Sequence, residues 1–235
     1  MDKVCLVTGV GPDKGTGSEI ARYFSENGYM VAMLARSSKN LQFLEEKYPN
    51  TKGFCCDVGK IDHLKNTINK VQSELGDPDI VIHNAPSATR GPILDLDYED
   101  LEKNFRVNVT ALFVLVQNTV AQMINKGSGS IMVTGNTAAT RGKANWGFFA
   151  STKAAQRILA ESLAREFGPK GIHVAYFVID ALINTPRTRP YLAPDMEDSF
   201  FSEPFAIAKE IFNVAHQHKS AWSFLVELRP FGEKW

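Results

Sequence analysis

Short apolar runs rich in β-branched residues alternate along the chain with longer stretches of helical periodicity. Several of the apolar runs are continuous, which is typical of strands that are covered on both faces. Strands are predicted at Val4–Thr8, Met30–Ala35, Gly53–Cys56, Ile80–His83, Ser130–Thr134, His173–Val178 and Ser223–Leu228. Helices are predicted at Gly17–Asn27, Leu41–Tyr48, Ile61–Leu75, Glu99–Asn125, Gly147–Phe167 and Pro204–His218. This succession predicts a single α/β domain, a doubly wound parallel sheet of about seven strands with helices on both faces and a ligand crevice at the carboxyl ends of the strands.

The segment 182–205 interrupts this alternation. It carries Pro186, Pro190 and Pro194, which stop regular structure, and aromatic residues such as Tyr191 that favour burial. A flexible substrate lid over the crevice explains both features. An ordinary long surface connection is the alternative.

Composition adds mainly exclusions. The 235 residues are 44% hydrophobic with a formal net charge of +0, so neither nucleic acid nor an acidic membrane is expected as a partner. Cys5, Cys55 and Cys56 have neither a disulfide framework nor metal-ligand spacing, and no metal is predicted. We expect no apolar run long enough to span a bilayer, no signal peptide before the first strand, and a cytoplasmic location.

The first predicted strand runs into a glycine-rich loop that opens a helix. Glycines let such a turn tighten and let backbone N–H groups approach a pyrophosphate at the helix N-terminus. Its position between the first strand and the first helix predicts dinucleotide binding. The candidate binding residues in this loop are Gly9, Gly11, Lys14, Gly15 and Gly17.

A second motif, Phe148-Phe149-Ala150-Ser151-Thr152-Lys153-Ala154-Ala155, resembles the catalytic helix of the short-chain dehydrogenase/reductase family. The glycine-rich loop is similar to the Thr-Gly-x-x-x-Gly-x-Gly loop of that family, with two more residues between Gly9 and Gly15. The resemblance covers nearly the whole chain. It implies a Rossmann-type fold, hydride transfer between a nicotinamide cofactor and a small-molecule substrate, and a homodimer or homotetramer.

The end of the second strand bears on the choice of cofactor. NAD enzymes of this kind place an acidic residue there, which accepts hydrogen bonds from the ribose 2′-hydroxyl. Ala35 occupies that position, and Arg36 follows it. Arg36 suits a 2′-phosphate through charge-assisted hydrogen bonds, and Lys14 is a second candidate cation. The cofactor predicted is therefore NADP(H) rather than NAD(H).

Further cofactor contacts are implied by the resemblance. Asp57-Val58 matches the family pair whose Asp meets the adenine amino group, and Asn84-Ala85 matches residues beside the cofactor. Thr185 matches a Thr near the nicotinamide amide. Pro86 replaces the usual Gly, so the turn after the fourth strand must differ. His83 is either a ligand or base, or a structural histidine at a strand end, and we favour the structural role.

The catalytic residues of the family are only partly kept. Asn108 matches the asparagine that holds a water in a proton relay, and Lys153 matches the lysine that contacts the nicotinamide ribose. Asn136 stands in place of the Ser that polarises the carbonyl, with the hydroxyl of Thr137 beside it. Phe149 stands in place of the Tyr that donates the proton. In this respect the chain most resembles a divergent subgroup of similar length, with Phe at the Tyr position.

No tyrosine lies between Tyr98 and Tyr176, so no small shift of alignment supplies the missing hydroxyl. Three functions remain open. One is an NADP(H)-dependent reductase of a carbonyl, imine or activated C=C, with the proton from Lys153, Thr137, a water on Asn108, or a tyrosine of the lid. The second is an inactive NADP(H)-binding sensor or partner subunit, and the third is a lyase or isomerase.

The loops expected to line the substrate pocket diverge from the family. They carry Arg90, Arg141 and Lys143, which are either solvated loop charges or a sign of an anionic group on the substrate.

Overall fold

The computed structural model describes residues 3–232, and the first two residues of the segment on which the signal-peptide prediction rests lie outside them. Seven strands form one sheet in the order β3-β2-β1-β4-β5-β6-β9, and every neighbouring pair is parallel. The strands are β1 (Lys3–Thr8), β2 (Tyr29–Ala35), β3 (Thr51–Cys55), β4 (Ile80–His83), β5 (Gly129–Asn136), β6 (Ile172–Ile179) and β9 (Leu225–Leu228). The chain reverses its direction of winding between β1 and β4, which is where a ligand crevice opens in such sheets. The predicted doubly wound α/β fold is confirmed.

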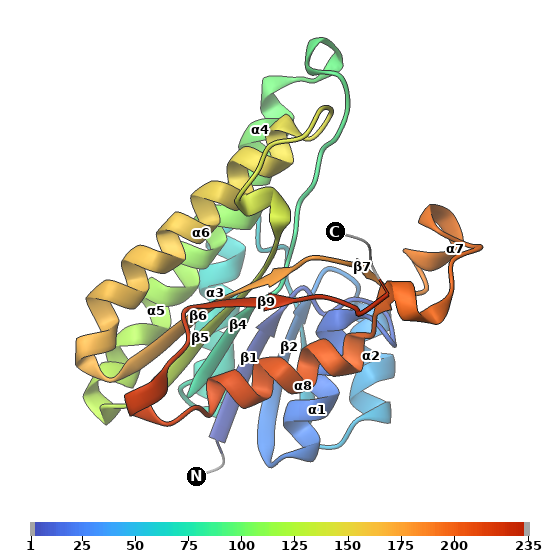
Figure 1. Ribbon diagram of the computed structural model, residues 1–235. Coiled ribbons are helices and arrows are strands. Elements are labelled where there is room, and N and C mark those ends of the chain that lie inside the picture. The colour runs from blue at the N-terminus through green and yellow to red at the C-terminus, as the bar shows by residue number, and fades with distance from the viewer. Residues whose placement is uncertain (1–2, 233–235) are drawn as a thin grey trace.

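Helices cover both faces of the sheet (Figure 1). One face carries α1 (Thr16–Glu26), α2 (Ser38–Lys47) and α8 (Pro204–Ala215), and the other carries α3 (Ile61–Leu75), α5 (Ala111–Lys126) and α6 (Gly147–Phe167). Each face has its own apolar cluster, and every residue of β6 is buried. This explains why the strand segments are continuous apolar runs.

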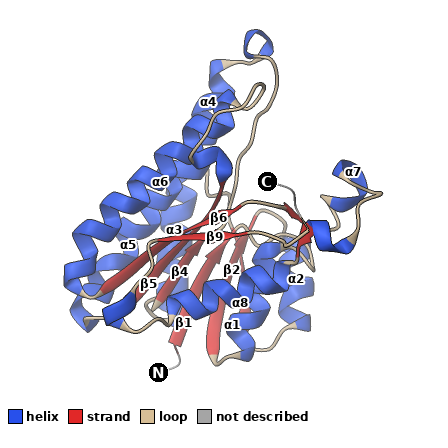
Figure 2. Ribbon diagram, viewed as in Figure 1, coloured by secondary structure: helices blue, strands red, loops and turns tan. Residues whose placement is uncertain are grey.

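The loops contain short helical turns, and the longest loops lie at the carboxyl edge of the sheet (Figure 2). The helical turns are η1 (Ile93–Asp95), η3 (Thr137–Ala139), η4 (Gly168–Lys170), η5 (Asp198–Phe200) and η6 (Lys219–Ala221). A long excursion between β4 and α4 (Tyr98–Phe105) carries η1 beyond the sheet (Figure 1).

The predicted helix Glu99–Asn125 is divided. Helix α4 leads into a π-helical turn, η2 (Arg106–Thr110), and α5 continues from it. A π turn carries one extra residue per turn and is common at functional sites, and this one contains the buried Asn108.

The run Tyr98–Lys126 is long and apolar enough to cross a membrane by length and composition alone. The expectation that no apolar run reaches that length is therefore wrong. Half of the most apolar 18-residue stretch of this run is buried inside the fold, where α5 packs against α3 and α6. Such burial is what a core helix requires, so its apolar character has an explanation within the fold.

The predicted lid segment contains some regular structure. Strands β7 (Leu182–Ile183) and β8 (Phe201–Ser202) pair in parallel at its base, and α7 (Arg189–Leu192) projects from the body (Figure 1). Tyr191 on α7 is 81% exposed. In this conformation the Tyr191 side chain lies at the protein surface. Closure of the lid stays a prediction.

Candidate active site

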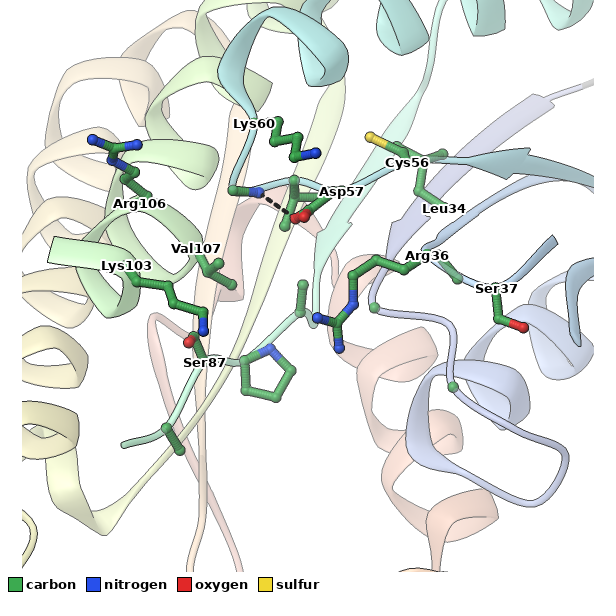
Figure 3. Close-up of a pocket in the computed structure, with 18 of the residues that line it drawn as sticks. Leu34, Arg36, Ser37, Cys56, Asp57, Lys60, Ser87, Lys103, Arg106 and Val107 are labelled. Carbon is green, nitrogen blue, oxygen red and sulfur yellow. Dashed lines mark hydrogen bonds between the residues drawn. The ribbon is translucent and has the colours of Figure 1, made fainter. Parts of the chain in front are cut away.

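A cavity of about 1120 Å³ opens at the carboxyl ends of the first four strands, with α4 and the π turn on its far wall (Figure 3). The predicted cofactor residues that line it are Gly9, Gly11, Ala35, Arg36, Asp57, Val58 and Ala85. The predicted cofactor residues that do not line it are Lys14, Gly15, Gly17, Asn84, Lys153 and Thr185, and the predicted catalytic residues Asn108, Asn136, Thr137 and Phe149 lie outside the lining as well. The structure thus brings together the residues expected at the adenosine and pyrophosphate end of a dinucleotide.

Close backbone contacts explain two glycines of the loop. Gly9 has a φ of +71°, and a Cβ there would lie 2.5 Å from the Cα of Ala85. A Cβ on Gly17 would lie 2.4 Å from the carbonyl oxygen of Gly9. The loops after β1 and β4 therefore meet the start of α1 at a distance that only glycine permits.

The lengthened loop is anchored at Asp13 and Gly11 to α2 and to the residue after that helix. The carboxylate of Asp13 accepts a hydrogen bond from the Tyr48 hydroxyl (2.5 Å) and pairs with the Lys47 ammonium (2.6 Å). Partial burial opposes ionisation of Asp13, but these hydrogen bonds outweigh it and lower its pKa. Asn40 Nδ2 also donates to the carbonyl of Gly11 (2.7 Å). Lys14 is exposed and outside the cavity lining, so its role as a second cation stays a prediction.

Arg36 reaches into the cavity from the end of β2, and Lys103 enters from α4 opposite (Figure 3). The guanidinium of Arg36 forms no ion pair within residues 3–232, so its donors are available to an anion. Arg187, from the lid segment, also lines the cavity. Arg187 was not predicted from the sequence. The signal that could have indicated it is its position two residues after Thr185, a predicted cofactor residue.

His83 is a structural residue beneath the cavity floor. Its Nε2 lies 3.0 Å from the carbonyl of Val107, which only accepts, so Nε2 carries the hydrogen. Nδ1 then accepts from the Thr8 hydroxyl at 3.1 Å. Burial, aided by the charge of Lys153, lowers the pKa of His83 to about 3. The ring is therefore neutral and already has partners at both nitrogens, which favours the structural role over that of a base.

Asn84 also serves the scaffold. Its Nδ2 donates to the carbonyl of Gly9 (3.1 Å), and its Oδ1 accepts from the Thr134 hydroxyl (3.0 Å). These bonds connect the ends of β1, β4 and β5.

Lys153 is held in a buried hydrogen-bond chain. Its side chain is buried, the residue being 4% exposed, and its Nζ donates to the carbonyl of Thr134 (3.0 Å) and to Gln156 Oε1 (2.5 Å). Gln156 is 0% exposed, and its Nε2 donates to the carbonyl of Asn108 (2.7 Å). Burial lowers the pKa of Lys153 to about 7. An amine that titrates near neutrality is suited to proton transfer.

Gln156 was not found by sequence reasoning. Its only signal was its position three residues after Lys153, on the same side of α6.

The side chain of Asn108 is occupied by neighbouring residues. Its Oδ1 accepts from the backbone N–H of Ser87 (2.9 Å), and its Nδ2 donates to the Ser87 carbonyl (2.8 Å) and to the Thr152 hydroxyl (2.9 Å). The Asn108 carbonyl is the acceptor of the Gln156 amide. The predicted water-holding role of Asn108 is untested, and here an amide side chain takes the position between this carbonyl and Lys153.

The sequence matches the family model for short chain dehydrogenase over residues 3–193. The chain belongs to the short-chain dehydrogenase family. It is 27% identical to carbonyl reductase (NADPH) 2 of Sus scrofa over 213 residues, covering 88% of this chain and 85% of the relative. It is 30% identical to the D-erythrulose reductase of Gallus gallus over 170 residues, covering 72% of this chain and 67% of the relative.

Solved structures agree with the fold of this short-chain dehydrogenase. A metagenomic short-chain oxidoreductase in complex with NADP superposes with a TM-score of 0.84 at 21% identity, covering 98% of each chain. A single-residue variant of actinorhodin polyketide ketoreductase with NADPH superposes with a TM-score of 0.86 at 20% identity, covering 97% of this chain and 95% of that one.

The short-chain dehydrogenase carries a covered phenylalanine at the position predicted for its tyrosine. Phe149 is 4% exposed, and its ring lies 5.8 Å from that of Trp146. The guanidinium carbon of Arg90 lies 3.8 Å from the Trp146 ring centre and 5.7 Å from that of Phe149. An aromatic ring and a cation therefore stand above Phe149.

Two polar side chains next to α6 have hydrogen-bonding groups without a partner within residues 3–232. Asn136 accepts from the backbone N–H of Ala138 through Oδ1 (3.1 Å), while its Nδ2 has no acceptor within residues 3–232. Thr137 follows at the start of η3, and its hydroxyl likewise has no partner in the described part of the short-chain dehydrogenase. Thr185, in the lid segment, is instead paired with the Thr188 hydroxyl at 2.8 Å.

Proposed function

We propose that this short-chain dehydrogenase is an NADP(H)-dependent oxidoreductase that reduces a small carbonyl, imine or activated C=C, with Lys153 donating the proton. The observation that carries the proposal is the buried Lys153 amine between two fixed acceptors, the Thr134 carbonyl and Gln156 Oε1. The altered catalytic set is that of a subgroup in which phenylalanine replaces the tyrosine.

The residues around the cavity suit NADP(H). The glycines after β1 allow a pyrophosphate to approach the backbone, Arg36 is free to pair with a 2′-phosphate, and Ala35 leaves no acid to repel it. Asp57, on the opposite wall, suits the adenine amino group. The bound cofactor supplies the hydride. The name of the Sus scrofa carbonyl reductase and the NADPH bound in the ketoreductase structure support the choice of NADP(H).

The hydrogen-bond geometry around Lys153 supports its proposed role as the proton donor. The Asn108 carbonyl only accepts, so Gln156 must direct Nε2 toward it and Oε1 toward Lys153. Two N–H bonds of Lys153 are thereby taken by Gln156 and Thr134. The ammonium form keeps one further N–H, which it passes to the substrate oxygen or nitrogen as hydride reaches the neighbouring carbon. Lys153 is then left as the neutral amine, a form that its buried environment favours.

The test is NADPH oxidation against panels of carbonyls, imines and enones, with Lys153→Met and Phe149→Tyr beside the parent protein. Loss of a positioned general acid lowers rates by about 100- to 10,000-fold. We expect the turnover of Lys153→Met to fall by this amount at saturating NADPH. Undiminished turnover in Lys153→Met removes Lys153 from the mechanism.

A second function is favoured by the cover over Phe149. Trp146 and Arg90 occupy the space above its ring, and the cavity lining does not include Phe149. This suits an NADP(H)-binding sensor or partner subunit without turnover. The sensor or partner function would be favoured if NADPH binds tightly but is not oxidised with any substrate panel, and if Phe149→Tyr is also inactive.

We also propose a homodimer or homotetramer, in which α5 and α6 meet their copies. Phe113 on α5 and Ile158 on α6 are large apolar side chains left exposed on these helices. Light scattering at micromolar concentration tests the assembly, and a monomer refutes it. A cytoplasmic location likewise stays a prediction, tested by cell fractionation.

A further inference from the structure

The cover over Phe149 has an uncompensated positive charge. Arg90 stacks on the half-buried Trp146 ring at 3.8 Å, and its guanidinium forms no ion pair or hydrogen bond within residues 3–232. Lys143 Nζ lies 5.9 Å from the same ring and also has no acidic partner in that range. By contrast, Arg141 has an acidic partner, Asp180, at 3.9 Å. Of these three loop cations, Arg90 and Lys143 are therefore available to an anionic ligand, whereas Arg141 is already paired.

Arg90 is exposed, and contacts around it restrain its position. The backbone N–H of Gly91 donates to the carbonyl of Asn145 (2.9 Å), which joins the loop after β4 to the loop before α6. Stacking on Trp146 restrains the guanidinium plane and leaves the donors at its edge free. Partial burial lowers the pKa of Arg90, and a bound anion would offset that penalty on its charge.

We propose that Arg90 binds a carboxylate of the substrate, so that the enzyme acts on oxo acids. The inference rests on the proposed reductase function and names the substrate class of the same site. A guanidinium edge presents two parallel N–H donors that match the two oxygens of a carboxylate. Arg90 lies beside Phe149, which precedes Lys153 by one turn on α6, so a carboxylate held by Arg90 would place the attached carbonyl next to that helix.

The reaction balances with the groups at hand. When bound, NADPH would supply the hydride for the new C–H bond; the C=O π electrons would move to oxygen, and Lys153 would transfer its proton there. The products are a hydroxy acid, the oxidised cofactor and neutral Lys153. Arg90 keeps its proton throughout because the guanidinium does not titrate in this range.

The experiment is isothermal titration of 2-oxo acids from pyruvate to phenylpyruvate, each paired with its methyl ester, with and without NADP⁺. We compare the parent protein with Arg90→Met and with the matched control Arg141→Met. Charge-assisted hydrogen bonds predict that acids bind about 10- to 100-fold more tightly than esters, and that Arg90→Met abolishes this preference. Arg141→Met should keep it.

The inference is overturned by equal binding of acids and esters, by a preference that survives in Arg90→Met, or by binding of inorganic phosphate as tight as that of the best oxo acid. The absence of binding by any acid also overturns it. NADPH affinity, measured in parallel, decides the proposed function separately. Intact NADPH binding without acid preference removes only the role of Arg90, and loss of NADPH binding removes the proposed function, while the cofactor-free titrations still test Arg90.

Discussion

Replacing Gln156 by glutamate should raise the pKa of Lys153. The substitution puts a negative charge where a neutral oxygen now lies 2.5 Å from the amine, at a position with 0% exposure. At about 4 Å and an effective dielectric constant of about 20, opposite unit charges attract by about 4 kcal/mol, or about three pKa units. Burial of the carboxylate opposes part of this gain. We expect the pKa of Lys153 to rise from about 7 by about one to three units.

The control substitutions act in different directions. Gln156→Leu removes the acceptor that favours the ammonium, so it should lower the pKa of Lys153 further. Gln42→Glu changes the net charge equally on the exposed side of α2 and should leave this pKa unchanged. Both Gln156 variants deprive the Asn108 carbonyl of its donor, which costs about 1–3 kcal/mol of stability, so folding is checked first by circular dichroism.

NMR of the lysine side-chain nitrogen measures the pKa directly, whether or not the protein turns over. In an active enzyme the alkaline limit of the single-turnover pH profile should move with it, because a general acid works only below its pKa. An unchanged Lys153 pKa in a folded Gln156→Glu protein would refute the hydrogen-bond chain. A shifted pKa with an unmoved pH profile would keep the chain and reject Lys153 as the acid.

Two further perturbations test other parts of the site. Arg36→Met should weaken NADPH binding by about 10- to 100-fold and leave NADH binding unchanged, as measured by fluorescence titration, and an equal loss for both cofactors would contradict the 2′-phosphate role. Burial lowers the pKa of Lys153 from its ordinary 10.5 to about 7, so between these pH values the unfolded chain binds the extra proton and stability rises with pH. Urea unfolding across that range should show the rise in the parent protein and a smaller one in Lys153→Met, and equal slopes would mean that Lys153 is not desolvated.

The fold was predictable because its evidence is local. Continuous apolar runs mark the strands, and the glycine-rich loop lies where Gly9 and Gly17 make contacts that exclude a side chain. The π turn was missed because the residues on both sides of it have helical spacing, and the extra residue shifts only the phase of that pattern. The apolar run Tyr98–Lys126 was underrated because five of its six charges lie within Glu99–Arg106, which leaves an uncharged stretch up to Lys126.

The polar core of the site was less predictable. Gln156 reads in sequence as an ordinary polar residue of a helix, and its role depends on where α6 meets the π turn of another helix. The same holds for Arg90, which gains its aromatic support only when the loops after β4 and β5 meet. Such contacts depend on tertiary geometry between segments about 50 residues apart, which no local pattern encodes.

The anchoring of Asp13 also bears on how the protein responds to its cofactor. Ordering a flexible loop residue costs about 1–2 kcal/mol of backbone conformational entropy. Tyr48 and Lys47 hold the Asp13 carboxylate, and Asn40 holds the Gly11 carbonyl, through contacts within the chain itself. The phosphate loop has thus lost this freedom during folding, and a dinucleotide meets a preorganised surface. The longer loop should therefore bind by rigid docking, with little change in hydrogen exchange of residues 9–17 when the cofactor arrives.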